Sequence, residues 1–306
     1  MQKISMLQDI DKFIELKKNS IKQRLEGIDN HIKPKLHIFY DINYENEATK
    51  SYLKSKINMG KELGIEVILR PLNGVILSLL YYVNEVDFQD GTILQLPASE
   101  DIQKTYKELY KRSDVDGFFN IDCVYNNTEN EVLPATPKGI MEYLEYFLKE
   151  RGNGKKINKM NVLIMGRGKL VGKPLAAMML NKCATLQIAT SKTKITDLKV
   201  MYRNADIIIL ATGDKNSLSM IPKTYTLGKS AKTKPKNCSK KIIIDTGIFK
   251  NEDGSLRGEF NIFEWGQTPI LNESVLFYTP VPKGVGRLTV ISLFDNVLIN
   301  ADKKGL

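Results

Sequence analysis

Short apolar runs alternate with helix-like segments along most of this chain of 306 residues, and this alternation constrains the fold more than any other feature. The runs have the length of strands, and the segments between them carry apolar residues at helical spacing. Strands that alternate with helices form parallel sheets covered by helices, so the sequence predicts an α/β protein. The predicted strands are LHIFY (36–40), IEVILR (65–70), TILQLP (92–97), MNVLIM (160–165), ATLQIAT (184–190), ADIIILA (205–211) and KIIIDTG (241–247).

Helical patterns fill the intervals and suggest two domains. The alternation of strands and helices continues after Pro137, and we expect a break between two α/β domains near 136–150. The predicted division sets residues 1–140, joined by the C-terminal helix 286–306, against residues 141–285. The later strands are continuous apolar runs, which predicts burial on both faces. The predicted helices cover about the first 30 residues, 47–63, about 74–85, about 100–111, about 138–150 and 286–302.

Composition excludes several classes of protein. The chain is 42% apolar and 26% charged, which is ordinary for a globular protein. Its longest apolar run, at 74–83, is too short for a bilayer span, and the N-terminus has no signal-peptide pattern. Three scattered cysteines and two histidines predict neither a disulfide framework nor a metal site. We therefore expect a cytoplasmic protein with no membrane partner and no bound metal.

The net charge of +10 has two interpretations. One is nucleic-acid binding. The other is a solvated, lysine-rich surface that serves at most a polyanionic small molecule. The lysines are spread along the chain without interleaved aromatic residues, which favours the second interpretation and predicts no nucleic-acid partner. One dense basic stretch, 228–241, contains Pro and Gly and is predicted to be a loop.

A glycine turn follows the predicted strand 160–165. Gly166, Gly168 and Gly172 have the spacing G-x-G-x-x-x-G and precede a helix. In this context glycines permit a tight turn and a close approach to a pyrophosphate, which the helix N-terminus favours. The sequence therefore predicts a dinucleotide site here.

The end of the next strand indicates which dinucleotide binds. NAD sites usually place an acid there for the ribose hydroxyl groups, whereas this strand ends in TSKT, 190–193. Arg167 and Lys192 can meet a 2′-phosphate, with Ser191 as a hydrogen-bond donor. NADP is thus favoured over NAD. The alternative is that Lys192 is an ordinary solvated residue at a strand end.

Tyr52 and Lys56 lie four residues apart in the predicted helix 47–63, so their side chains share one helical face. From spacing alone, the two residues form either a solvent-exposed edge of the helix or a functional pair. Lysines are so common in this chain that the spacing does not decide between the two.

Several segments together resemble the bifunctional methylenetetrahydrofolate dehydrogenase/methenyltetrahydrofolate cyclohydrolase family. They occur in the family's order from about residue 35 to the end of the chain. The matching segments are YLKSK (52–56), DGTILQLP (90–97), DVDGF (114–118), TPKGIMEYL (136–144), GRGKLVGKPLA (166–176), TSKT (190–193), ATG (211–213), DTGI (245–248) and TPVPKGVGRLT (279–289).

The resemblance implies a folate-binding N-terminal domain, a Rossmann-type C-terminal domain and a cleft between them. It implies that NADP oxidises 5,10-methylenetetrahydrofolate to the 5,10-methenyl cation, which water then opens to 10-formyltetrahydrofolate. It also implies a homodimer. A relative that retains only one of the two activities is the nearest alternative, and a basic nucleic-acid-binding α/β protein is a more distant one.

The resemblance also assigns site residues. Lys56 matches the essential cyclohydrolase lysine, Gln95 its hydrogen-bond partner, Asp116 the acid that binds the pterin, and Tyr52 the ring that stacks on the folate. The remaining assignments are Gly166, Arg167, Gly168, Ser191, Lys192 and Ile248 for the cofactor, and Gly286 and Thr289 for the substrate.

Some positions depart from the family's pattern. Gly168 replaces a serine, Glu259 replaces the aspartate of Gly-Asp-Val, and Lys283 and Arg287 stand where glycine and proline are usual. These changes bear more on the cofactor than on the cyclohydrolase. We expect Lys283 and Arg287 to attract an anionic substrate tail.

Overall fold

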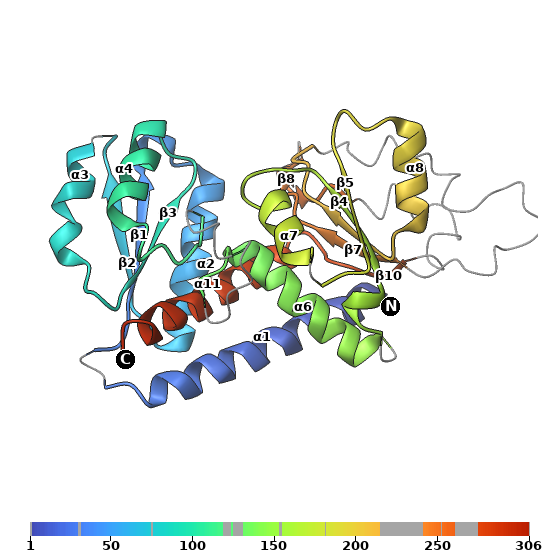
Figure 1. Ribbon diagram of the computed structural model, residues 1–306. Helices are drawn as coiled ribbons and strands as arrows, with labels where there is room; N and C mark the ends of the chain where they lie inside the picture. Colours follow the sequence, from blue (N-terminus) through green and yellow to red (C-terminus); the bar gives the residue numbers. More distant parts are fainter. Residues whose placement is uncertain are drawn as a thin grey trace, which may run out of the picture. The chain divides into compact units, whose positions relative to one another are not determined.

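The computed structural model of the chain divides into two compact units, which Figure 1 shows as ribbons. Ile14–Lys138 with Thr289–Leu306 form the three-strand unit, and Met1–Phe13 with Gly139–Leu288 form the five-strand unit. The predicted boundaries of the folate-binding and cofactor-binding domains remain a prediction. The structure describes residues 2–29, 32–74, 76–118, 124, 131–152, 155–180, 182–214, 241–251, 253–260 and 275–305. The basic stretch 228–241, apart from Lys241, lies outside these residues.

The division between the units falls within α1 (Gln2–Glu26), α6 (Ala135–Arg151) and α11 (Val285–Asp302). None of the helices in the described part of the chain is long and apolar enough to cross a bilayer.

The three-strand unit contains a parallel sheet in the order β2-β1-β3. Its strands are β1 (Leu36–Asp41), β2 (Val67–Leu72) and β3 (Gly91–Gln95). β2 begins two residues later than predicted, because the Ile65 amide still donates to Gly60 O at the end of the preceding helix. The carboxyl ends of all three strands meet at one edge of the sheet.

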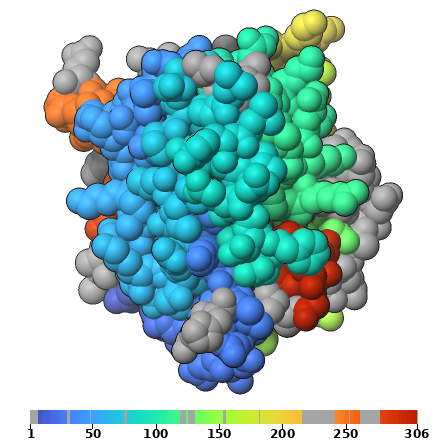
Figure 2. All heavy atoms as spheres, turned by 90° about the vertical axis from the view of Figure 1, so that its left-hand side faces the viewer, coloured from blue at the N-terminus to red at the C-terminus, as the bar shows by residue number. Residues whose placement is uncertain are grey.

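Helices α2 (Glu47–Leu63), α3 (Ile76–Tyr81) and α4 (Glu100–Tyr110) belong to this unit, with short 3₁₀ turns at Ile42–Tyr44 and Val83–Glu85. An aromatic core joins the sheet to α4: the Phe39 ring lies 5.7 Å from that of Tyr106 and 4.7 Å from that of Tyr110. Figure 2 shows the face of the unit that carries α3. Leu77 and Tyr81 of this helix are exposed.

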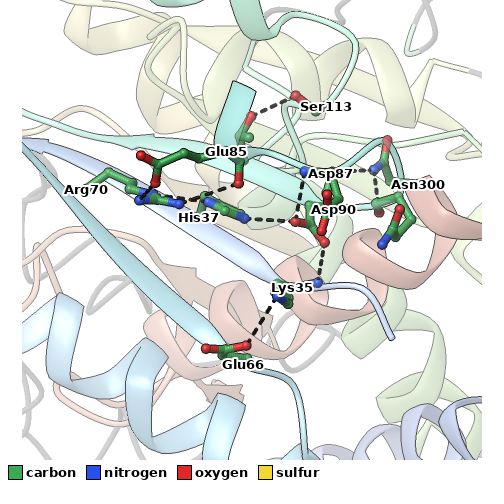
Figure 3. Close-up of polar contacts among 11 residues, drawn as sticks. Lys35, His37, Glu66, Arg70, Glu85, Asp87, Asp90, Ser113 and Asn300 are labelled. Atoms are coloured by element: carbon green, nitrogen blue, oxygen red, sulfur yellow. Dashed lines mark hydrogen bonds and ion pairs between the residues drawn. The ribbon is translucent and has the colours of Figure 1, made fainter. Parts of the chain in front are cut away.

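A buried polar network lies at the amino edge of the same sheet (Figure 3). Arg70 Nε donates to His37 Nδ1 at 3.3 Å, so the proton of the neutral ring sits on Nε2 and points to Asp90 Oδ2 at 2.8 Å. Asp90 also accepts from the Lys35 amide, and its carbonyl accepts from Asn300 Nδ2 of α11 at 2.9 Å. These contacts give His37 a structural role and fix α11 to the start of β3.

The five-strand unit contains a parallel sheet in the order β10-β7-β6-β4-β5. Helices α7 (Gly172–Met179) and α8 (Ile195–Asn204) connect strands of this sheet, and a 3₁₀ turn at Ile157–Lys159 precedes the first of them along the chain. The strands are β4 (Asn161–Met165), β5 (Thr185–Ala189), β6 (Ile207–Leu210), β7 (Lys241–Asp245) and β10 (Val275–Tyr278), beside a small antiparallel pair, β8 (Phe249–Lys250) and β9 (Leu256–Arg257).

Two features of this sheet differ from the prediction. β10 was not predicted at all. β5 was expected to be buried on both faces, but it is the edge strand, and Ile188 in it is 42% exposed. The α/β class with parallel strands is confirmed, because every pairing within the two larger sheets is parallel.

Candidate active site

Helix α2 places Lys56 at the carboxyl edge of the three-strand sheet. Asn46 caps the helix by accepting a hydrogen bond from the Thr49 amide, and Gly64 ends it in the left-handed conformation with φ +79°. Lys56 itself is 7% exposed, which is rare for a lysine. Its Nζ donates a hydrogen bond of 2.7 Å to Gln95 Oε1. The pair therefore joins residues 39 positions apart in the sequence.

Gln95 is the last residue of β3, and its amide is held at both ends. Its Nε2 donates to the Leu96 carbonyl at 2.9 Å, which leaves Oε1 to accept from Lys56. Because the Leu96 carbonyl can only accept, the NH₂ group of the Gln95 side chain must point to it, and Oε1 must point to Lys56 Nζ. The lysine is thus held at one position at the strand end.

Asp116 is the charged partner of this site. Burial raises the pKa of the Asp116 carboxyl, while the Lys56 ammonium lowers it. Burial likewise lowers the pKa of Lys56, while the Asp116 carboxylate raises it. Burial dominates for both groups because each charge lies in a poorly solvated site. The structure therefore brings together Lys56, Gln95 and Asp116, and burial at this site lowers the pKa of the lysine.

Tyr52 lies one helical turn before Lys56 and is half-buried. Burial raises the pKa of its hydroxyl group, so the ring is a neutral, partly apolar surface beside the lysine. The position of Lys54 differs, since that side chain is exposed to solvent. The two lysines of this stretch therefore lie in opposite environments, so Lys56 is not part of a solvated edge of the helix, whereas Lys54 is.

The segment that carries Asp116 is braced by α11. The amide of Asn296 donates to Val115 O at 2.9 Å and to Leu133 O at 2.7 Å, and its Oδ1 accepts from Lys138 Nζ at 2.9 Å. Sequence reasoning missed Asn296. The available signal was a fully buried asparagine within an apolar helical run, since a buried amide needs partners.

The glycine turn after β4 is built as predicted. Gly166 has φ +105°, and a Cβ on it would lie 2.1 Å from Ala211 O. A Cβ on Gly172 would lie 2.4 Å from Gly166 O, so the helix starts directly against the turn. Around Gly168, by contrast, a Cβ would meet no heavy atom within 4 Å. A tight turn with open space at its second glycine, followed by the N-terminus of α7, fits a dinucleotide pyrophosphate.

The residues predicted to meet the adenosine end lie on the neighbouring strand end. β4 and β5 pair directly, so the turns that follow them share one edge of the sheet. Thr190 and Thr193 organise the second turn: the Thr190 amide donates to Thr193 Oγ1 at 2.9 Å, and the Lys192 amide donates to Thr190 Oγ1 at 3.3 Å. Arg167, Ser191 and Lys192 are all exposed, which leaves two cations and a hydroxyl group open to solvent.

The remaining predicted residues are dispersed. Ile248 follows β7 and is 42% exposed. Gly286 belongs to the five-strand unit, and a Cβ on it would meet no heavy atom within 4 Å. Thr289 belongs to the three-strand unit, where its hydroxyl group lies 2.9 Å from that of Thr136.

Lys283 and Arg287, which depart from the family's pattern, occupy unusual positions. Lys283 has φ +83°, a conformation that favours glycine, the residue that the resemblance expects there. Arg287 Nη1 lies 2.5 Å from Asp11 Oδ1, so its charge already has a partner. Attraction of an anionic substrate tail remains a prediction for Lys283, and the ion pair weakens it for Arg287.

Comparison with known proteins gives consistent results. Residues 134–305 match the family described as tetrahydrofolate dehydrogenase/cyclohydrolase, NAD(P)-binding domain. The bifunctional protein FolD of Campylobacter jejuni is 31% identical over 85% of this chain and 86% of its own length. The bifunctional protein FolD of Campylobacter concisus is 30% identical over 96% of both chains. The crystal structure of the bifunctional Campylobacter jejuni enzyme has a TM-score of 0.76 at 27% identity, covering 97% of this chain and 98% of that one.

Proposed function

The chain belongs to the tetrahydrofolate dehydrogenase/cyclohydrolase family, and from this premise we propose which of its residues carry the two reactions. The protein is a bifunctional folate enzyme. With NADP it oxidises 5,10-methylenetetrahydrofolate to the 5,10-methenyl form, and it then hydrolyses that form to 10-formyltetrahydrofolate. The observation that carries the assignment of residues is the hydrogen bond from the buried Lys56 to Gln95, together with the electrostatic interaction between Lys56 and Asp116.

Lys56 is the proton-transfer group of the cyclohydrolase. Hydrolysis forms a bond from a water oxygen to the methenyl carbon, and the water must lose a proton as it attacks. An uncharged Lys56 takes that proton and returns it to the ring nitrogen when the carbon–nitrogen bond breaks. Burial supports this role because it lowers the pKa of the lysine. Gln95 supports it by holding Nζ at the strand end.

Asp116 and Tyr52 bind the folate in this proposal. The pterin ring presents two hydrogen-bond donors on its amino-amide edge, and a carboxylate is a suitable acceptor for both. The half-buried ring of Tyr52 offers a stacking surface one turn away from Lys56. Gly286 and Thr289 complete the proposed substrate contacts.

The turn Gly166–Gly168 and the start of α7 hold the pyrophosphate of NADP, which supplies the hydride acceptor when bound. Arg167, Ser191 and Lys192 contact the 2′-phosphate, and Ile248 lines the cofactor site. Support comes from the open space at Gly168 and from the exposed cations on adjacent strand ends.

The Gly168 departure favours one second candidate: a relative in which the cyclohydrolase is retained and the dehydrogenase is weakened. Gly168 offers no side-chain hydroxyl group to the cofactor. We also propose a cytoplasmic homodimer that has neither a nucleic-acid nor a membrane partner. Cysteine usage and the dispersed lysines support this part of the proposal.

An absorbance assay for methenyltetrahydrofolate, run in parallel with NADP and NAD, tests both reactions. Absorbance rises as methylenetetrahydrofolate is oxidised and falls as the product is hydrolysed. Lys56→Met stops the fall and spares much of the rise, whereas Lys54→Met, at an exposed lysine of the same helix, changes neither. If both activities survive Lys56→Met, the assignment of Lys56 is wrong.

A further inference from the structure

Glu259 is a buried carboxylate that binds the turn after β6. It is 4% exposed. Its Oε1 accepts from the Thr212 and Gly213 amides, both at 3.0 Å, and its Oε2 accepts from Thr212 Oγ1 at 2.7 Å. Hydrogen bonds to an ionised acceptor are stronger than neutral ones, so a single side chain fixes two successive peptide groups.

The turn that Glu259 holds lies against the glycine turn of the nucleotide site. A Cβ on Gly166 would lie 2.1 Å from Ala211 O and 2.9 Å from Thr212 N. β4 pairs with β5 on one side and with β6 on the other, so the order of the strands reverses at β4. In open α/β sheets, ligands bind outside the carboxyl ends of the strands at such a reversal. The turn 211–213 therefore forms the wall opposite the turn 166–168.

The backbone of Glu259 is fixed independently of its side chain. Asp245, at the end of β7, accepts from the Glu259 amide at 3.2 Å and from the Phe260 amide at 2.7 Å. Two glycines allow this approach: a Cβ on Gly258 would lie 2.0 Å from Asp245 Oδ2, and one on Gly247 would lie 2.6 Å from Glu259 Cγ. With the main chain held in place, the length of the glutamate side chain determines whether the carboxylate reaches the turn.

We propose that Glu259 is a positioning residue for the dehydrogenase: it fixes the Thr212–Gly213 turn as the second wall of the NADP crevice. The aspartate that the family resemblance expects here is shorter by one methylene group. Glu259 touches neither substrate nor reacting atoms in this proposal. The inference rests on the proposed use of NADP at this site.

Titration calorimetry of NADP binding to the full chain tests the inference without relying on turnover. For Glu259→Ala we expect the Kd for NADP to rise about tenfold, because two backbone amides of the wall lose their acceptor. Glu259→Gln keeps the length and one carbonyl oxygen, and the Thr212 hydroxyl group can rotate to accept from the new amide, so its Kd should stay within about threefold of the wild-type value. The cyclohydrolase rate, measured on methenyltetrahydrofolate alone, should be unchanged in both variants.

A core variant separates positioning from general loosening of the unit. Ile208, in β6, is fully buried and precedes the same turn, so Ile208→Val lowers the melting temperature of the unit without removing a contact to the turn. A Kd for Glu259→Ala equal to that of the wild type, or an equal rise of Kd in Ile208→Val, overturns the inference. Absence of NADP binding by the wild-type chain overturns the proposed function instead.

Discussion

The side-chain amide of Asn296 donates a hydrogen bond of 2.9 Å to the carbonyl of Val115, the residue before Asp116. A second bond, to Leu133 O, ties the two chain segments on either side of Asp116 to the same amide. Gly117 completes the junction with φ +69°, where a Cβ would lie 2.7 Å from the backbone at Leu133. The position of Asp116 relative to Lys56 is thus set by a residue 180 positions later in the chain.

Asn296→Ala should therefore impair folate binding as well as stability. Two buried carbonyl groups lose their donor, so we expect the free energy of unfolding to fall by about 2–4 kcal/mol. We also expect the KM for methenyltetrahydrofolate to rise, because Asp116 is no longer fixed. Steady-state kinetics and urea denaturation measure the two effects.

Asn300→Ala is the matched control for that experiment. Asn300 lies on the same helix and donates to Asp90 O and Gln89 O, directly before β3 and away from Asp116 in the sequence (Figure 3). Its loss should reduce stability by a similar amount and leave the KM for folate unchanged. A rise in KM in both variants would show that stability alone governs folate binding.

The pH dependence of hydrolysis should report the charge of Lys56. Because burial lowers the pKa of this lysine and the uncharged form accepts the proton, kcat should rise with pH and level off below the pKa of a free lysine. The Asp116 carboxylate raises the pKa of Lys56, so Asp116→Asn should move the profile toward lower pH. A profile measured over pH 6–10, in both variants at saturating substrate, checks the direction, and a shift to higher pH would contradict it.

Gly168→Ser should strengthen NADP binding. A Cβ at this position meets no heavy atom within 4 Å, and the residue is outside the left-handed region of φ. The serine therefore fits without strain and offers one hydroxyl donor, which should lower the Kd about five- to tenfold. Gly168→Ala adds the same Cβ without the hydroxyl group and should leave the Kd unchanged. Equal effects of the two substitutions would assign the gain to backbone stiffening.

Asp245 should make the stability of the protein depend on pH. Burial raises the pKa of its carboxyl group to about 7, although three backbone amides donate to it. An unfolded aspartate titrates near pH 4, so between about pH 4 and 7 the folded state binds the extra proton. The contribution of Asp245 to stability therefore falls as the pH rises through this window.

Asp245→Asn should flatten that slope in urea denaturation at pH 5, 6 and 7. Asp253→Asn, at an exposed carboxyl group whose pKa is lowered by Ser255, should keep the wild-type slope. A slope that is unchanged in Asp245→Asn would contradict the assignment.

The regular parts of the fold were predictable because burial leaves a period in the sequence. The predicted helix 47–63 coincides with α2, and the strands buried in the middle of the sheets fall within two or three residues of their predicted positions. β10 was missed because a strand of four residues, VLFY, is too short to show a period. The exposure of β5 could not be predicted, because it follows from the place of β5 at the end of the strand order. The sequence of a single strand does not encode that order.

The residues of the cofactor site were easier to predict from the sequence than those of the folate site. The glycine turn carries its geometry in its own residues, so Gly166 could be identified locally. Lys56 could not: the spacing to Tyr52 left two interpretations, and Lys56 is distinguished from Lys54 by its burial and by its contact with Gln95 of β3. The roles of Asn296 and Glu259 depend on contacts made across the fold: an asparagine in an apolar helical run indicates burial, but it does not identify the partners.

Asn296 and Asn300 occupy successive turns of α11. Asn296 holds the two chain segments that flank Asp116, and Asn300 holds the residue before β3. Each residue added to a helix rotates the remainder of that helix by about 100° and advances it by about 1.5 Å. An insertion between the two asparagines would thus turn one of them away from its carbonyl groups whatever its identity. This stretch of the chain should tolerate changes of side chain in evolution far better than changes of length.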